Sequence, residues 1–179
     1  MLQSYIFRVI LSHNATMPEK NNASDSGFDL RARGFSKVSN GKIDNTTWFD
    51  EWDDKSFDLL PGERVLITTG VQIAQPNIEE CETIVNDIQV RPRSGLALKY
   101  GITILNSPGT VDNEYRNDIG VILYNTDKYE TFTINDGDRI AQMVFSVYMN
   151  IHNSYLFKVE TFDDTTTRGL AGYGDSGVE

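Results

Sequence analysis

The sequence predicts an all-β fold in a single domain. β-Branched and aromatic residues gather in short runs, and these runs recur at short intervals along the chain. Gly, Asn, Asp and Pro stand between the runs, as is typical of the turns of a sandwich or barrel. With 179 residues and no internal repeat, the chain is long enough to bury an ordinary core.

The expected elements follow from these runs. The strongest strand signal, 65–73, is rich in Val, Ile and Thr and is bounded by Pro61, Gly62 and Pro76. The clearest helical signal covers one or two turns around 94–99. In chain order, the strands that the sequence predicts are 5–11, 65–73, 102–105, 119–124, 129–134, 140–148 and 155–162.

The domain is expected to span 1–164, with a flexible Gly-rich arm at 165–179. Two stretches interrupt the rhythm of the strands and are interpreted as insertions, at about 36–58 and 77–87. The part of the first insertion from 41 to 58 holds both tryptophans and six acids. Its aromatic side chains are expected to fold back on the domain. The alternative is that it binds a protein partner.

Charge and cysteine content exclude several classes of function. The chain has 16 Lys and Arg against 26 Asp and Glu, a formal net charge of −10, which argues against nonspecific binding to nucleic acid. Cys81 is the single cysteine, so an intrachain disulfide is excluded. His13 and His152 cannot complete a Cys/His zinc site with it. Any metal is therefore expected to be a hard cation held by oxygen.

The early apolar run, 5–11, is short and is interrupted by Arg8. It therefore predicts a strand, and no export signal or membrane anchor. We expect a cytoplasmic protein that associates with neither membrane nor nucleic acid.

Five short segments combine Gly, Arg, Ser and Asp in ways that a plain core does not require. In the second of them, Pro92 precedes Arg-Ser-Gly at the start of a helical turn. Such a turn offers backbone N–H groups, a hydroxyl and a guanidinium to one anion, although similar turns also cap helices. The segments are 25–32, 91–97, 106–116, 136–142 and 168–177, and Arg91, Arg93, Arg116, Arg139 and Arg168 within them predict a local cationic pocket.

The last three segments each allow two interpretations. Segment 106–116 is predicted to form a hairpin with acid, amide and aromatic groups at its bend, and an ordinary turn is the alternative. Segment 136–142 is predicted to be a turn that enters a strong strand, and the alternative to a functional role is that Asp138 and Arg139 only form a structural ion pair. Segment 168–177 has four glycines in ten residues and predicts a mobile arm. Its Arg, aromatic ring and Ser suit a lid over a base attached to phosphates.

Taken in order, the five segments resemble the five motifs of the trimeric dUTPases, and 106–112 is similar to bacterial-type members. The resemblance implies a distorted jelly-roll β-barrel, a homotrimer with a C-terminal arm, and three active sites shared between subunits. It also implies Mg²⁺-dependent hydrolysis of dUTP to dUMP and pyrophosphate. This reaction keeps uracil out of DNA and supplies dUMP for dTMP synthesis.

The resemblance also implies roles for individual residues. Asp112 matches the general base that activates the attacking water, and Gln142 is expected near that water and the phosphates. Arg93, Ser94 and Gly95 match phosphate-binding positions. The remaining substrate-binding positions are Asn106, Thr110, Val111, Tyr115 and Gly120, of which Tyr115 packs under the deoxyribose, and Arg168, Tyr173, Gly174 and Ser176 of the arm.

Mg²⁺ is expected to be held mainly by the substrate phosphates and water, with no direct protein ligand and with Asp29 as a neighbour of its water shell. The sequence departs from the family pattern at four positions. Asn117 stands where Gly usually follows Tyr-Arg, and Asn is the next best residue for a positive φ. Tyr173 replaces Phe, Ala171 replaces Gly, and Asp175 places a negative charge beside the expected γ-phosphate.

Two alternatives remain open at this point. A dCTP deaminase shares the fold but lacks the combination of Asp-x-x-Tyr with this tail. A regulatory protein of the same fold would act through the acidic, tryptophan-rich insertion.

Overall fold

The structure is a computed structural model that describes residues 7–51, 54–74, 84–149 and 158. Short antiparallel strands make up most of the described chain, with one α-helix, α1 (Ser94–Tyr100), and one 3₁₀ turn, η1 (Phe49–Glu51). The strands are β1 (Arg8–Leu11), β2 (Gly27–Arg31), β3 (Gly34–Ser36), β4 (Val38–Ser39), β5 (Lys42–Ile43), β6 (Thr47–Trp48), β7 (Ser56–Leu59), β8 (Arg64–Thr68), β9 (Val71–Ala74), β10 (Ile84–Pro92), β11 (Ile102–Ile104), β12 (Gly109–Val111), β13 (Gly120–Asn125), β14 (Phe132–Asn135) and β15 (Arg139–Met149).

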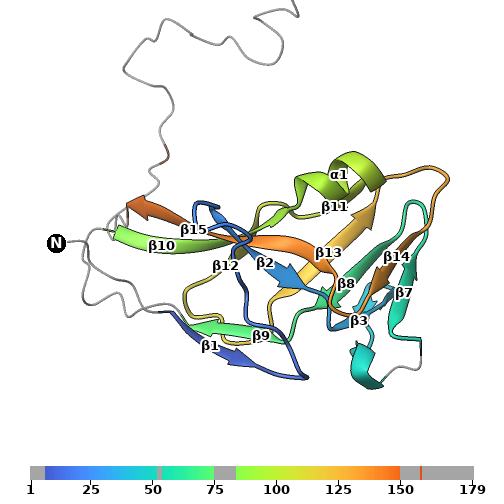
Figure 1. Cartoon of the computed structure of the whole chain (residues 1–179), viewed down its shortest axis with the longest axis horizontal. Helices are drawn as coiled ribbons and strands as arrows, with labels where there is room; N and C mark the ends of the chain where they lie inside the picture. The colour runs from blue at the N-terminus through green and yellow to red at the C-terminus, as the bar shows by residue number, and fades with distance from the viewer. Residues whose placement is uncertain (1–6, 52–53, 75–83, 150–157, 159–179) are drawn as a thin grey trace, which may run out of the picture.

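Two larger sheets organise these strands. One has the order β12-β10-β15-β2, and the other has the order β11-β13-β8-β3-β6. The ribbons β1-β9, β14-β7 and β4-β5 extend them, with β1 and β9 below the first sheet in Figure 1 and β7 and β14 at the opposite end of the molecule. Neighbouring strands in the sheets are distant in the sequence, which excludes a simple meander. The many strands and the single short α-helix of the described residues confirm the predicted all-β class.

One hydrophobic core joins the two sheets. Along β13, side chains alternate between buried and partly exposed, so Val121 and Leu123 point inward. Ile88 of β10 and Met143 of β15 belong to the same buried cluster. Asn125 is fully buried as well, and its amide donates to the carbonyl oxygens of Leu59 and Glu130, so this polar group is satisfied.

Several strand predictions are confirmed with small shifts at their ends: β1, β11, β13, β14, β15 and α1 lie where the sequence placed them. The single strand predicted at 65–73 is wrong, because the chain bends between β8 and β9. At the bend Gly70 has a φ of 69°, and a Cβ there would lie 2.6 Å from the carbonyl oxygen of Ser12. The strand predicted at 155–162 lies outside the described residues, apart from Lys158.

The second predicted insertion, 77–87, overlaps a regular strand. β10 begins at Ile84 and pairs with β15 along its whole length, so 84–87 belong to the sheet. Residues 77–83 lie outside the described part of the chain. The strands β2 and β12 were also not predicted, since their residues were interpreted only as functional segments.

The described aromatics of the first insertion fold onto the domain. Phe49 is fully buried, Trp48 stacks on the His13 ring with centroids 3.7 Å apart, and Phe57 packs against Phe35. These contacts agree with the first interpretation of this insertion for the residues described; Trp52 is outside them. A protein partner for 41–58 stays a prediction.

A buried arginine ties this insertion to the domain. Arg33 donates twice to the carbonyl oxygen of His13, at 2.9 and 2.7 Å, and pairs with Asp136 and, at 3.7 Å, with Asp50 of η1. Arg33 is only 8% exposed, so it depends on these partners to offset its desolvation.

Neither described helix is long and apolar enough to cross a membrane.

Candidate functional site

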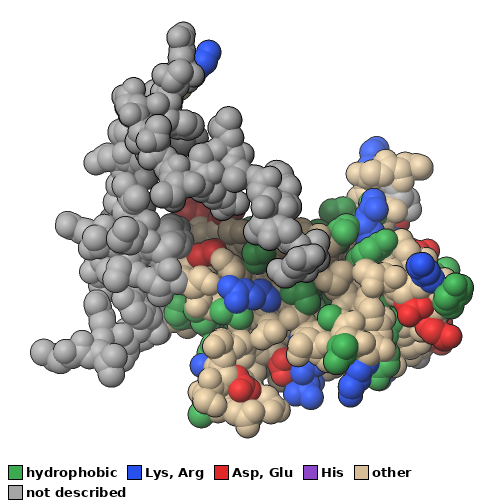
Figure 2. Space-filling model, turned by 90° about the horizontal axis from the view of Figure 1, so that it is seen from above, with side chains coloured by type: hydrophobic (Ala, Val, Ile, Leu, Met, Phe, Trp, Pro, Cys, Tyr) green, Lys and Arg blue, Asp and Glu red, His purple; other side chains and the backbone are tan. Residues whose placement is uncertain are grey.

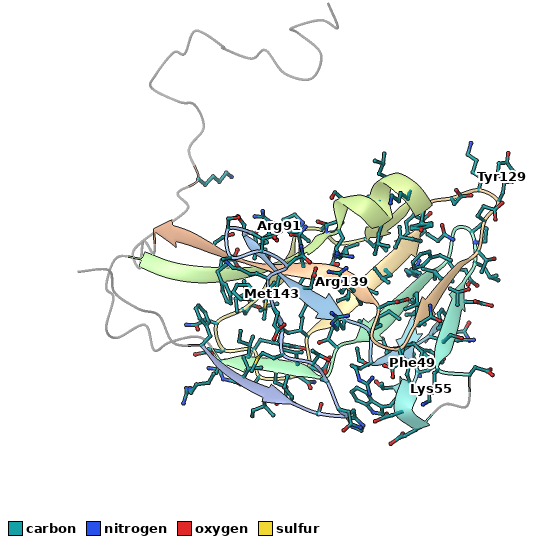
Figure 3. The ribbon with its side chains drawn as sticks, viewed as in Figure 1. Phe49, Lys55, Arg91, Tyr129, Arg139 and Met143 are labelled. Atoms are coloured by element: carbon teal, nitrogen blue, oxygen red, sulfur yellow. The ribbon has the colours of Figure 1, made fainter. Side chains whose placement is uncertain are left out.

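A polar groove of about 610 Å³ lies where β2, β15 and the first turn of α1 meet. Three of the five predicted functional segments, the first, second and fourth, contribute to it. Figure 3 shows Arg139 beside these strands and Arg91 near the same sheet. The groove is lined by Asn21, Asp25, Ser26, Gly27, Asp29, Arg93, Ser94, Gly95, Leu96, Lys99, Tyr100, Arg139 and Gln142.

Strand register brings these segments together. β15 is the inner strand between β2 and β10, and Gln142 pairs with Asp29 on one side and with Arg91 on the other. Pro92 pairs with Ala141 and leads directly into α1. Positions that are far apart in the sequence are therefore one strand spacing apart, about 4.8 Å.

Gln142 is held in a defined orientation at the centre of this arrangement. Its Nε2 donates to the carbonyl oxygen of Pro92 at 2.8 Å. A Cβ at Gly27 would lie 2.3 Å from Oε1 of Gln142 and 3.0 Å from its Cβ. Because Gly27 has no side chain, the Gln142 side chain can occupy this space.

The Asp29 carboxylate joins two arginines of the groove. Its oxygens lie 3.0 Å from Nε of Arg93 and 3.2 Å from Nη1 of Arg139. Arg93 also donates to the backbone carbonyl of Arg139 at 3.1 Å. The predicted ion pair between Asp138 and Arg139 is wrong: Arg139 pairs with Asp29, while Asp138 accepts from the N–H of Asn135. Asp29 thus holds two guanidinium groups in place, and its predicted position beside the water shell of the metal stays a prediction.

The charge of the groove favours anions although the whole chain is acidic. Arg93, Lys99 and Arg139 face it, against two carboxylates, Asp25 and Asp29. On the face that Figure 2 shows, Lys and Arg side chains of the described residues are scattered and form no broad patch. Of the five arginines that predict a cationic pocket, Arg93 and Arg139 line the groove, Arg91 and Arg116 do not, and Arg168 lies outside the described residues.

The third segment lies elsewhere in the same chain. It does not fold into the predicted hairpin: β12 pairs with β10, with Thr110 opposite Gln89. β12 and β2 are the two edges of their sheet, three strand spacings or about 14 Å apart. Asn106, Thr110, Asp112 and Tyr115 are exposed and do not line the groove, and Val111 is buried beside β10.

The turn after β12 has internal hydrogen bonds. The N–H of Tyr115 donates to the carbonyl oxygen of Asp112 at 3.0 Å, and the Tyr115 hydroxyl donates to that of Asp118 at 2.8 Å. The positive φ expected at Asn117 is wrong, because the described non-glycine residues with positive φ are His13, Asn14, Asn40 and Lys55. Asn117 serves the turn through its side chain, which accepts the N–H of Asp118 at 2.8 Å.

Gly120 begins β13 and also lies outside the groove. A Cβ there would lie 2.7 Å from Cδ1 of Leu66, so a larger residue would require the Leu66 side chain on β8 to move. The predicted arm residues Arg168, Tyr173, Gly174 and Ser176, and the departures at Ala171 and Asp175, lie outside the described residues.

Sequence reasoning missed several residues of the groove. Lys99 was detectable, because it lies four positions after Gly95 and so on the same face of α1. Tyr100 follows it at the end of the helix. Asn21 had no such signal, since the loop that holds it reaches the groove only through the fold.

Comparisons with known proteins show the family to which this chain belongs. A family model described as dUTPase matches residues 49–177. The deoxyuridine 5'-triphosphate nucleotidohydrolase of Ehrlichia canis is 42% identical over 167 residues, covering 93% of this chain and 90% of that protein. The enzyme of the same name from Heliobacterium modesticaldum is 40% identical over 169 residues, with 94% and 93% covered.

A solved structure agrees at the level of the fold. The Staphylococcus bacteriophage 80alpha dUTPase with dUPNHPP has a TM-score of 0.69, at 24% identity, and covers 97% of this chain and 99% of that one. Together, these matches make the protein a hydrolase of nucleotide metabolism. The chain belongs to the dUTPase family, which confirms the expected dUTP diphosphatase and disfavours the dCTP deaminase alternative.

The space at Gly27 leads to a prediction. Gly27→Ala places a methyl group where the Gln142 side chain lies and should displace it, with a loss of about 10²-fold in turnover of the nucleotide. The urea midpoint of unfolding should change less than turnover, because the nearest atom, Oε1 of Gln142, is at the end of a flexible side chain and Cβ, at 3.0 Å, has to move only slightly. Steady-state kinetics of Gly27→Ala, Gln142→Ala and the double variant provide the check. In the Gln142→Ala background, where only Cβ remains near the methyl group, Gly27→Ala should cost little further, and additive losses would contradict the assignment.

Proposed function

We propose that this protein hydrolyses dUTP to dUMP and pyrophosphate by Mg²⁺-assisted attack of water on the α-phosphate. The observation that carries the proposal is the cationic groove, in which Asp29 orders Arg93 and Arg139 beside the first turn of α1 in a chain of this family. Removal of dUTP keeps uracil out of DNA, and the dUMP formed supplies dTMP synthesis.

The groove suits the triphosphate part of the substrate. Asp29 and the Arg139 carbonyl engage Nε and Nη1 of Arg93, and its other guanidinium nitrogen would donate to a phosphate. Ser94 and Gly95 are exposed at the same end of the groove and complete the predicted phosphate contacts. Charge that develops on the pyrophosphate leaving group would be stabilised by these groups.

The carboxylates of the groove fit a Mg²⁺ ion that arrives with the phosphates. Asp29 is paired with two arginines, and Asp25 accepts the N–H and the side-chain amide of Asn22. Among the described residues, no group of three or more His, Cys, Asp or Glu could hold a metal ion. Substrate oxygens and water would thus supply most ligands, and the ion would neutralise phosphate charge.

The nucleoside part is assigned to the third segment. Asp112 is exposed on the turn after β12 and can act as the general base. Tyr115 would pack under the deoxyribose and exclude a 2′-hydroxyl, while Asn106 and the backbone of Thr110 and Val111 would read the uracil. The arm residues Arg168, Tyr173, Gly174 and Ser176 would close over the bound nucleotide.

A complete site then requires more than one subunit. Asp112 and Tyr115 follow β12, which lies at the opposite edge of the sheet from β2, and they are not part of the lining of the groove. A second copy that presents its third segment to the groove would bring base and phosphates together. A closed ring of three copies gives three such sites, which is the homotrimer that the resemblance implies.

The experiment that tests the function is ³¹P NMR of the protein with Mg²⁺ and dUTP, with dCTP, dTTP and UTP in parallel. Pyrophosphate from dUTP, and none from the other three, is the expected result. Release of orthophosphate would place the attack on the γ-phosphorus and contradict the proposed mechanism.

The role of Asp112 is tested by Asp112→Asn. The variant should bind dUTP as the wild type does but lose roughly 10³-fold or more in turnover, because the amide cannot accept the proton of the water. Calorimetric binding of a non-hydrolysable dUTP analogue and steady-state kinetics measure the two quantities. Glu114→Gln, two residues along the same exposed turn, is the matched control and should keep its activity. Unchanged turnover of Asp112→Asn would falsify the assignment.

Sharing of the site between subunits is tested by complementation. Arg93→Ala damages the groove and Asp112→Asn damages the third segment, so each variant alone should be inactive. When the two are unfolded together and refolded in equal amounts, about one quarter of the sites in random trimers pair an intact groove with an intact third segment. Activity should recover accordingly. Refolding of each variant with the doubly substituted chain is the control, and inactivity of the mixed sample would show that each site lies within one subunit.

A further inference from the structure

Asp118 lies at the junction between the turn after β12 and the start of β13. Its Oδ1 accepts the N–H of Thr69 at 3.0 Å, in the bend between β8 and β9. Thr69 is 1% exposed, so this N–H has no access to bulk water. The side chain of Asp118 therefore satisfies a buried backbone donor of a distant bend.

The bend that Asp118 holds is itself rigid. The hydroxyl of Thr69 donates to the carbonyl oxygen of Ile119 at 2.9 Å, and the N–H of Ile119 donates to that of Val71 at 2.8 Å. Gly70 is buried at a φ of 69° with Ser12 packed against it. Residues 118 and 119 are thus fastened to the body of the domain by side chain and backbone together.

The Tyr115 ring is attached to this anchored residue. Its hydroxyl donates to the backbone carbonyl of Asp118 at 2.8 Å, while its own N–H donates to the carbonyl of Asp112. Burial of the hydroxyl, and second the nearby Asp118 carboxylate, raise the pKa of Tyr115 above its usual value. The phenol therefore stays a hydrogen-bond donor throughout the neutral range.

Burial of the Asp118 carboxylate costs free energy of folding that an apolar side chain packed at the same position would not cost. Its Oδ2 is buried and has no hydrogen-bond partner among the described residues. Burial raises the pKa of Asp118, which the N–H groups of Thr69 and Gly70 and the nearby His13 oppose in part. An apolar residue would avoid this cost but would leave the N–H of Thr69 without an acceptor.

We infer that Asp118 is a positioning residue for the part of the site that binds the sugar. Its side chain is bonded to the bend at Thr69, and its backbone carbonyl accepts the Tyr115 hydroxyl, so the Tyr115 ring is held to the body of the domain through Asp118. The inference rests on the proposed function for the role of Tyr115. Asp118 touches no reacting atom. It acts by holding the ring where a deoxyribose fits and a ribose, with one more hydroxyl, does not.

Selectivity between dUTP and UTP tests this role. In Asp118→Ala the ratio of kcat/KM for dUTP to that for UTP should fall about tenfold or more, because a mobile ring no longer excludes the 2′-hydroxyl. Asp118→Asn keeps the acceptor for Thr69 and should retain most of the selectivity. Asp127→Ala removes an aspartate that accepts backbone N–H groups of a different turn, and should leave the ratio unchanged. A folded Asp118→Ala variant with undiminished selectivity overturns the inference, since a purely structural role would lower stability alone.

A second measurement does not depend on activity. With ¹³Cζ-tyrosine labelling, and Tyr115→Phe to assign the resonance, the pKa of Tyr115 should fall further in Asp118→Ala than in Asp118→Asn, because both variants lose the negative charge but only Asp118→Ala loses the acceptor for Thr69 and frees the ring from its partly buried position. Equal titrations in the two variants would show that the ring is not held through Asp118 and would overturn the inference. If the wild-type protein released no pyrophosphate from dUTP, the proposed function would fail, and this titration would still decide the positioning role.

Discussion

The groove depends on the pairing of β15 with strands on both sides. β15 lies between β2 and β10, and its register sets Gln142 beside Asp29 and Arg91. A shift of one residue would turn Gln142 to the opposite face, because side chains alternate along a strand. Burial of Ala141 and Met143 on either side of Gln142 in the core opposes such a shift. Hydrophobic packing below the sheet therefore determines the polar arrangement above it.

Electrostatics then acts within this frame. A chain with a net charge of −10 would repel a triphosphate at long range, so attraction has to be local. Asp29 makes this possible, because one carboxylate orders two guanidinium groups and reduces the repulsion between them. Arg93 and Arg139 keep further donors, so their role in orientation is compatible with binding an anion.

Local patterns predicted the strands that alternate regularly and the residues of the motifs, but not what the register brings together. β10 was not recognised because acids precede it, and its pairing with β15 is a long-range property. The split between β8 and β9 occurs at Gly70, which has a positive φ and where the carbonyl oxygen of Ser12 leaves no room for a Cβ. The sequence analysis paired Arg139 with its neighbour Asp138, whereas the structure pairs it with Asp29, 110 positions earlier in the chain. Sequence reasoning identified Asp29, Arg93 and Arg139 of the groove but not Lys99, and the pairing of these groups needed the sheet.

The separation of the third segment from the groove has a consequence for rigidity. If Asp112 and Tyr115 serve a groove on another copy, the phosphates bound there cannot hold them in place within their own chain. Their positions then depend on contacts within their own subunit, and the described contacts run through Asp118 to the bend at Thr69. A carboxylate with one unpaired buried oxygen is destabilising by itself. Its presence at this junction is understandable if the geometry of an exposed turn has to be determined before a second subunit and the nucleotide meet it.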